Sequence, residues 1–292
     1  MSKYGWLILM LSLSSGASAT NWQDDIAYLS SPALAGRKTG SAPSKLAQQY
    51  IVQRLTELGY RTERAGFSFT SGFFANTQGI NIFTSECQTR CLVISAHYDH
   101  LGRHGQRYYP GANDNASGVA ALLYLAQQLK AMKEQIIFVA FDGEEQGLHG
   151  AKHFVETQPA QRLYTNLNLD MLNLTNARSR LFVYAPHKMC AAAKQSLINS
   201  PVKLSVVRSG RSINRRLGKD ITDWRRASDH YAFLRRGIAA IFITAAEDKH
   251  YHSPEDTFEH INKARYQATL PMLAQFSRAL LTRQCQAVAH PR

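Results

Sequence analysis

Histidine and acidic side chains gather in five short stretches of this 292-residue sequence. The stretches are SAHYDH (95–100), GANDNASG (111–118), FDGEEQGLHG (141–150), NLDMLN (168–173) and YHSPEDT (251–257). Imidazole and carboxylate groups without nearby thiolates suit zinc, and suit manganese or cobalt less well. Each stretch alone has a simpler explanation, such as a surface loop or a helix cap. Taken together, the five stretches predict a metal centre.

Two of the stretches indicate how such a centre would divide its work. His97 and Asp99 alternate in an extended segment, so their side chains share a face, and a carboxylate commonly accepts the second N–H of a metal-binding imidazole. Glu144 and Glu145 are adjacent. Because their charges repel each other, packing does not explain why both are present. At a turn, one glutamate can bind a cation while the other acts as the general base that metal-assisted hydrolysis needs.

Two aspartates belong to the same hypothesis. Asp114 lies between a glycine-rich turn and the start of a predicted helix, where a helix N-cap is the alternative role. Asp170 interrupts a strand that otherwise reads as core, and a lone buried carboxylate is costly unless it is paired or bound to metal.

The elements that must position these residues alternate between strands and helices. Short strand-like runs predict strands at 79–83, 91–97, 135–141, 165–172, 181–185 and 239–245. Those that are apolar without polar alternation are expected to be buried on both faces. Helical spacing predicts helices over 44–59, 117–132 and 263–284, the last interrupted near Pro271. This alternation predicts an α/β fold, in which functional residues collect at the carboxyl ends of the strands.

The first nineteen residues have the pattern of a secretory signal peptide. One basic residue precedes an apolar stretch and the small residues Ala17-Ser18-Ala19. The apolar stretch is too short for a membrane anchor, and no later segment is apolar enough to cross a membrane. We therefore predict an exported chain, periplasmic or secreted, in which residues 20–292 form a single catalytic domain.

The sequence contains four cysteines, Cys87, Cys91, Cys190 and Cys285. An even number in an exported chain favours disulfides over metal ligation. Cys87 and Cys91 flank a short turn and are expected to pair, which leaves Cys190 for Cys285.

The formal net charge is +13, and residues 208–226 hold much of it. A basic surface suits anionic partners, but no nucleic-acid-binding motif is visible, so no nucleic-acid partner is expected. We interpret the basic segment as a solvated loop.

In their order along the chain, the five stretches resemble the motifs of secreted di-zinc aminopeptidases of the bacterial leucyl aminopeptidase type. LAGRKTG (34–40) resembles the N-terminal signature of the same family. The resemblance spans most of the chain after residue 19. It implies a three-layer α/β/α sandwich with a mixed, mostly parallel central sheet of about eight strands.

The same resemblance implies a metallo-aminopeptidase that removes N-terminal residues from peptides with a free N-terminus. Two zinc ions per chain would be bound by five residues, with Asp114 bridging the ions: His97, Asp114 and Asp170 for one, and Asp114, Glu145 and His252 for the other. Glu144 would be the general base acting on a water held between the ions, and Asp99 would support His97. The peptide bond between Asp114 and Asn115 is expected to be cis, as in the family.

Two alternatives stay open. A glutaminyl cyclase shares the expected fold, uses one zinc ion and closes N-terminal glutamine into pyroglutamate, and residues 229–243 also suit that group. A non-catalytic binding protein would use the basic face for an anionic polymer.

The chain is expected to be a monomer. The basic segment precedes SDHYAF (228–233), which lies near the active site in relatives, so we expect it to shape the substrate pocket. Met171 is expected either to line that pocket or to belong to the core.

Overall fold

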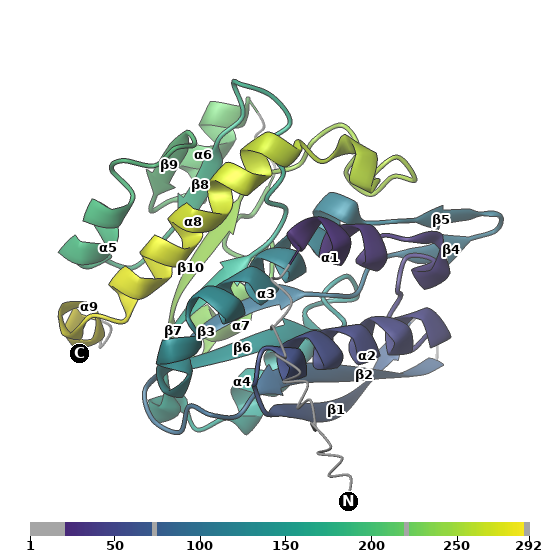
Figure 1. Cartoon of the computed structure of the whole chain (residues 1–292), viewed down its shortest axis with the longest axis horizontal. Helices are drawn as coiled ribbons and strands as arrows, with labels where there is room; N and C mark the ends of the chain where they lie inside the picture. Colours follow the sequence, from purple (N-terminus) through teal and green to yellow (C-terminus); the bar gives the residue numbers. More distant parts are fainter. Residues whose placement is uncertain (1–20, 72–74, 219–221, 289–292) are drawn as a thin grey trace, which may run out of the picture.

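The computed structural model describes residues 21–71, 75–218 and 222–288. Eight strands form one sheet in the order β1-β2-β6-β3-β7-β10-β8-β9 (Figure 1). Their bounds are β1 Thr62–Ser71, β2 Ala75–Thr84, β3 Cys91–His97, β6 Ile136–Phe141, β7 Leu163–Leu169, β8 Leu181–Tyr184, β9 Leu204–Val207 and β10 Ala239–Thr244. A separate hairpin joins β4 (Gly102–His104) to β5 (Arg107–Tyr109). The predicted signal peptide, residues 1–19, lies outside the described residues.

The centre of the sheet is parallel. Strands β6, β3, β7 and β10 are neighbours that run in one direction. Strands β1 and β2 add an antiparallel edge, and β8 pairs antiparallel with β10 but parallel with β9. The mixed, mostly parallel sheet of eight strands is therefore confirmed. Because the four central strands are parallel, their carboxyl ends meet at one edge of the sheet.

Helices cover both faces of this sheet. One face packs against α1 (Trp22–Leu29), α2 (Ala42–Glu57), α3 (Gly118–Gln128), α5 (Ala191–Ser196) and α8 (Lys263–Leu280). The other packs against α4 (His149–Thr157), α6 (Gly210–Leu217) and α7 (His230–Arg235). Figure 1 shows α1, α2, α3 and α8 lying across the front of the sheet. Within β3, Ile94 joins the first core and Val93 the second, as alternation along a strand requires.

The remaining helical segments are short. Within the described ranges they are α9 (Arg283–Val288) and five pieces of three to six residues, Pro32–Leu34, Ala112–Ser117, Lys130–Gln135, Ala160–Arg162 and Phe258–His260. None of the helices in the described ranges is long and apolar enough to cross a membrane.

The expected interruption at Pro271 is wrong, because α8 runs through it from Lys263 to Leu280. Proline removes the hydrogen bond to the carbonyl group four residues earlier, here that of Gln267. Both Pro271 and Gln267 lie on the exposed side of the helix, where water can satisfy that carbonyl. Strands β1 and β9 were not predicted either, because their partly exposed sequences lack the apolar run that marks the central strands.

Both expected disulfides are present, Cys87–Cys91 and Cys190–Cys285. The first closes a turn at the start of β3, and the second ties α5 to α9. They differ most in the length of chain they enclose, with sequence separations of 4 and 95 residues.

We predict that the two disulfides contribute unequally to stability. A cross-link that closes a longer loop removes more conformational freedom from the unfolded chain. Replacing Cys190 and Cys285 by serine should lower the free energy of unfolding by about 4–5 kcal/mol, against about 2 kcal/mol for the Cys87 and Cys91 pair. Urea unfolding of the two double variants measures this difference. Equal losses would contradict the loop-length explanation.

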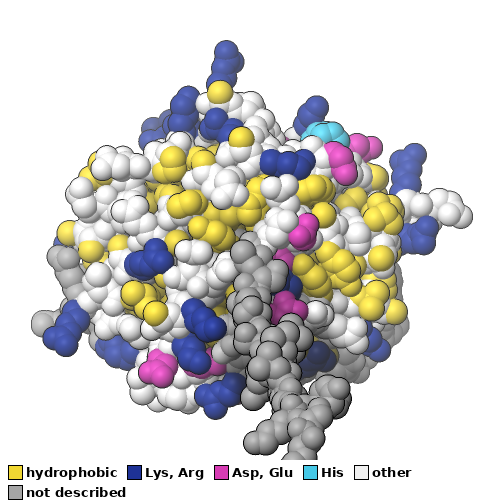
Figure 2. All heavy atoms as spheres, viewed as in Figure 1, with side chains coloured by type: hydrophobic (Ala, Val, Ile, Leu, Met, Phe, Trp, Pro, Cys, Tyr) yellow, Lys and Arg dark blue, Asp and Glu magenta, His cyan; other side chains and the backbone are white. Residues whose placement is uncertain are grey.

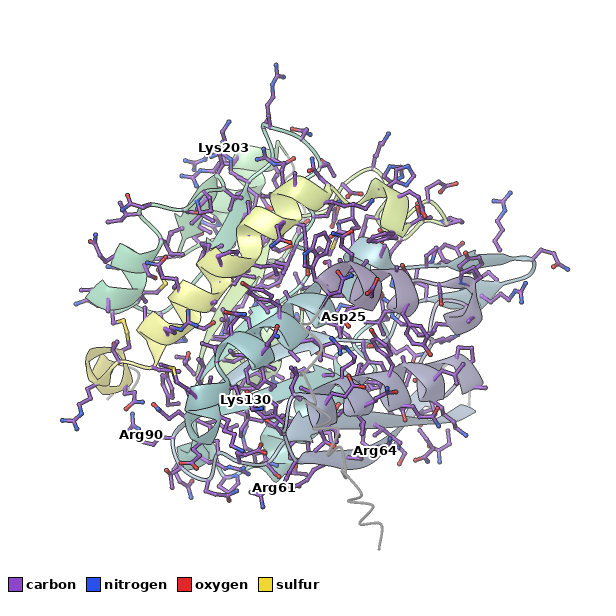
Figure 3. All side chains as sticks on the ribbon, in the orientation of Figure 1. Asp25, Arg61, Arg64, Arg90, Lys130 and Lys203 are labelled. Atoms are coloured by element: carbon purple, nitrogen blue, oxygen red, sulfur yellow. A yellow bond between two sulfur atoms is a disulfide. The ribbon has the colours of Figure 1, made fainter. Side chains whose placement is uncertain are left out.

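Basic side chains are spread over the surface. On the face seen in Figure 2 they lie mainly toward the rim, separated by neutral and hydrophobic groups. Arg61, Arg64, Arg90 and Lys203, labelled in Figure 3, come from three separate parts of the chain, since Arg61 and Arg64 lie three residues apart. Asp25 of α1, also labelled, lies beside α2 and pairs with Arg54 there, at 2.9 Å.

Candidate metal centre

The predicted site residues meet at the carboxyl edge of the central strands. His97 is the last residue of β3, Asp170 directly follows β7, and Glu144 and Glu145 follow β6. Asp114 belongs to the turn that leads into α3, and His252 lies in the loop after β10.

Three of these side chains converge on a first position. The Nε2 atom of His97 lies 3.4 Å from Asp114 Oδ1 and 3.4 Å from Asp170 Oδ1. All three residues are buried. They form one of two clusters, among the described residues, whose ligand atoms lie close enough together to hold a metal ion.

The second position uses the other oxygen of Asp114. His252 Nε2 lies 3.1 Å from Asp114 Oδ2 and 3.3 Å from Glu145 Oε2. The Asp114 carboxylate therefore faces both positions, one oxygen toward each. This is the arrangement that a bridging ligand requires.

These residues fit zinc. Ligand atoms about 2.0–2.1 Å from a tetrahedral ion stand roughly 3.3–3.4 Å apart, which follows from the geometry of the tetrahedron. The distances of 3.1–3.4 Å around Asp114 agree with that spacing. Asp170 Oδ1 is buried and accepts no hydrogen bond within the described part of the chain. Such an oxygen needs a partner, and a cation would supply it.

His100 is a further imidazole that the sequence interpretation left without a role. Its Nδ1 atom lies 2.7 Å from Glu145 Oε1 and 3.8 Å from Asp114 Oδ2. With Asp114 and Glu145 it forms the second cluster that could hold a metal ion. His100 is buried, whereas the side chain of His252 is 36% exposed. Two imidazoles thus flank the second position, and the presence of His100 within SAHYDH was the available signal.

Asp99 acts differently from the simple expectation. His97 Nδ1 lies 3.2 Å from the backbone oxygen of Asp99 and 3.7 Å from its carboxylate. The carboxylate instead accepts the backbone N–H groups of Glu144, at 3.1 Å, and Glu145, at 3.3 Å. Asp99 therefore fixes the turn that carries the two glutamates as well as the ring of His97.

Glu144 belongs to neither metal cluster. It lines the pocket that the predicted ligands also line, which we call the metal-centre pocket. Burial, together with the negative charges of Glu145 and Asp229, raises the pKa of its carboxyl group well above the usual range, although His97 opposes the shift. A carboxyl group in this environment is suited to taking up and giving back a proton.

The turn that carries Asp114 is tightly held. The bond between Asp114 and Asn115 is cis, as expected. The Asp256 carboxylate accepts the backbone N–H groups of Asn113 and Asp114, at 2.8 and 3.0 Å. Gly111 has a φ of +61°, and a Cβ there would lie 2.2 Å from the Asp114 backbone oxygen. These contacts leave the Asp114 side chain little freedom to move.

Arg37 holds the same turn from the N-terminal part of the chain. Its guanidinium group is fully buried and donates only to backbone oxygens. The acceptors come from four segments: Leu29, Tyr98, Pro110 with Gly111, and Asp114. Burial lowers the pKa of Arg37 to about 10, while nearby carboxylates, Asp114 first, oppose the shift. Arg37 lies within LAGRKTG, but its role as a brace could not be read from the sequence.

The basic segment is not a plain solvated loop, so that interpretation is wrong. It contains α6, whose Ile213 is buried, and Trp224, which is 4% exposed. The segment contacts the sheet through apolar side chains, since the ring of Trp224 packs near that of Phe242 in β10. Trp224 and Met171 both line the metal-centre pocket. This agrees with the expectations that the basic segment shapes the pocket and that Met171 lines it.

Two buried ionisable residues, Asp229 and His230, follow Trp224 in the sequence. Both carboxylate oxygens of Asp229 lack a hydrogen-bond partner within the described ranges, and burial raises its pKa to about 8. The ring of His230 stacks on Phe242 and donates from Nε2 to the Trp224 backbone oxygen, at 3.0 Å. His230 therefore positions Trp224. Neither residue was singled out from the sequence.

We predict that His230 makes the fold sensitive to acid. Burial lowers its pKa to about 3, whereas in the unfolded chain the value is about 6.5. Below pH 6.5 the unfolded chain binds a proton that the folded chain does not, so stability present above pH 6.5 is lost as the pH falls. Between pH 7 and 5 the native protein should lose about 2 kcal/mol more than His230→Gln. Urea unfolding at both pH values measures this, with the exposed His104→Gln as control. Parallel losses in all three proteins would contradict it.

Comparison with known proteins identifies the family of this chain. Residues 81–277 match the sequence model of peptidase family M28, and the chain belongs to that family. Aminopeptidase YwaD of Bacillus subtilis is 31% identical over 220 residues, which is 68% of this chain and 43% of that protein. A probable zinc metalloprotease of Pyrenophora tritici-repentis is 30% identical over 196 residues, 56% of this chain and 45% of the other. The chain thus matches less than half the length of these relatives.

Solved structures share the whole fold. The zinc aminopeptidase BSAP from Bacillus subtilis superposes with a TM-score of 0.72 at 17% identity, covering 92% of this chain and 97% of the other. The glutaminyl cyclase of Fimbriiglobus ruber superposes with a TM-score of 0.68, also at 17% identity, covering 90% and 96%. These similarities establish the α/β fold and do not by themselves separate the two activities.

Proposed function

We propose that this protein is an exported metallo-aminopeptidase that uses two zinc ions and Glu144 as general base. The observation that carries the proposal is the pair of metal clusters that share Asp114, with Glu144 beside them and in neither. The proposed ligands are His97, Asp114, Glu145, Asp170 and His252, with His100 as an additional imidazole at the second position. Two disulfides support folding in an oxidising compartment.

The chain's own residues would divide the reaction as follows. When bound, zinc lowers the pKa of water and polarises a peptide carbonyl group. Glu144 takes the proton of the attacking water and returns it to the leaving amine. Asp99 holds Glu144 in place through its backbone N–H. Trp224, Phe242 and Met171 form an apolar wall suited to the side chain of the N-terminal residue.

A glutaminyl cyclase is the second candidate, because such enzymes share this fold. A single-zinc site needs only one ligand cluster, whereas this edge of the sheet presents two. The second cluster is what favours hydrolysis. A binding protein without catalysis would not need the positioned Glu144.

One experiment separates the three possibilities. The purified zinc-loaded protein is incubated with peptides that begin with leucine or with glutamine, and the products are identified by mass spectrometry. Release of the first residue, abolished by a chelator and restored by zinc, supports the aminopeptidase. Loss of ammonia from glutamine peptides alone supports the cyclase, and no turnover of any peptide supports the binding protein.

A further inference from the structure

A groove lies beside the metal centre, next to the loop that follows β10. Its volume is about 680 Å³. Ala246 and Glu247 line both this groove and the metal-centre pocket, so the two adjoin along that loop. The other walls come from residues 173–180 after β7, from the end of α6 and from the segment that leads into α8.

The groove is rich in positive charge. Arg178, Arg180, Arg216 and Lys249 line it, and all four side chains are exposed. Arg180 donates to the hydroxyl of Ser205, and none of the four forms an ion pair within the residues that the structure describes. Four cations are therefore available to a ligand.

Two acidic residues, Glu247 and Asp248, also line the groove, and its four cations outnumber them. The Asp248 carboxylate accepts hydrogen bonds from the Asn113 side chain, at 3.3 Å, and from the His250 backbone, at 2.7 Å. Glu247 lies at the end shared with the metal centre. The outer part of the groove thus presents guanidinium groups, whose planar donors match a carboxylate better than an ammonium group does.

We propose that this groove binds a carboxylate on the leaving-group side of the substrate, so that the enzyme prefers peptides with an acidic residue or a free C-terminus shortly after the first residue. This inference rests on the proposed aminopeptidase function. Once the N-terminal side chain contacts the apolar wall near Trp224, the rest of the peptide must leave the centre along an open path. Because the groove adjoins the metal-centre pocket at Ala246 and Glu247, the residues that directly follow the first one would enter it.

A second opening on the other side of Trp224 is the competing path. It is lined by Arg211 and Arg225 but also by Asp223, whose carboxylate accepts the backbone N–H of Arg225. This opening carries fewer positive charges than the groove and is smaller, at about 330 Å³. The groove is therefore the better site for an anionic substrate.

The test uses the zinc-loaded protein and tripeptides that begin with leucine. The middle residue is alanine, glutamate or lysine, and each peptide is made with a free and with an amidated C-terminus. We expect kcat/KM for the amidated glutamate peptide to exceed that for the amidated lysine peptide by about tenfold, a preference that salt should weaken. A preference for free over amidated alanine peptides would identify the terminal carboxylate as a further source.

Matched variants locate the effect. Arg178→Gln with Arg216→Gln should lower kcat/KM for the carboxylate peptides about tenfold and leave the amidated alanine peptide within twofold. Arg215→Gln with Lys203→Gln removes the same charge from exposed positions outside the groove and should preserve the preference. The inference is overturned if no carboxylate preference exists or if it survives in the groove variant. Failure to hydrolyse even the amidated alanine peptide would overturn the proposed function as well.

Discussion

Replacing Glu144 by glutamine should lower kcat by roughly 10²–10⁴-fold while the zinc content stays unchanged. Glutamine has nearly the shape of glutamate but cannot accept the proton of the attacking water. Glu144 belongs to neither metal cluster, and Asp99 holds it through the backbone, which the substitution preserves. The change should therefore remove proton transfer alone.

Two measurements check this result, peptide hydrolysis and elemental analysis of bound zinc. Glu255→Gln provides the control, because Glu255 is an exposed acid in the same loop as His252. A Glu144→Gln variant that keeps nearly full activity would rule out the general-base role. A variant that loses activity together with zinc would show that Glu144 is a ligand instead.

Replacing Asp114 by alanine should have the second large effect, the loss of both zinc ions. One oxygen of Asp114 faces His97 and the other faces His252, so both positions lose a ligand at once. Asp170 contributes to the first cluster only, and Asp170→Ala should therefore retain zinc at the second position.

The stoichiometry of zinc in the two variants distinguishes these outcomes, and circular dichroism checks that both remain folded. Equal zinc content in Asp114→Ala and Asp170→Ala would mean that the Asp114 carboxylate does not bridge. Hydrolysis should be lost in Asp114→Ala whatever peptide is offered, since no ion would remain to activate water.

The sequence predicted the parts of the fold that depend on local patterns. Apolar runs marked three of the four central strands, β3, β6 and β10, because these strands are buried on both faces. Strand β9 was missed because exposed Val206 and partly exposed Leu204 give no such run. The course of α8 through Pro271 depended on which side of the helix faces water, and only the tertiary structure decides that.

For the candidate centre as well, some residues could be predicted from the sequence and others could not. Motifs identified the ligands, since their side-chain chemistry is visible residue by residue. The contacts that hold the ligands were not visible. Arg37 donates to backbone oxygens, which every residue has, and His230 acts by placing Trp224. Such partners are chosen by the three-dimensional arrangement, and no spacing along the chain records them.

The position of Arg37 has a practical consequence for preparing the protein. The stretch that matches the family spans residues 81–277 and contains every proposed zinc ligand. A recombinant fragment cut at those limits would nevertheless lack Arg37, and with it the buried cation that joins Leu29, Tyr98, Gly111 and Asp114. Such a fragment would carry the full set of ligands without the clamp that gathers them, so expression boundaries should begin ahead of α1.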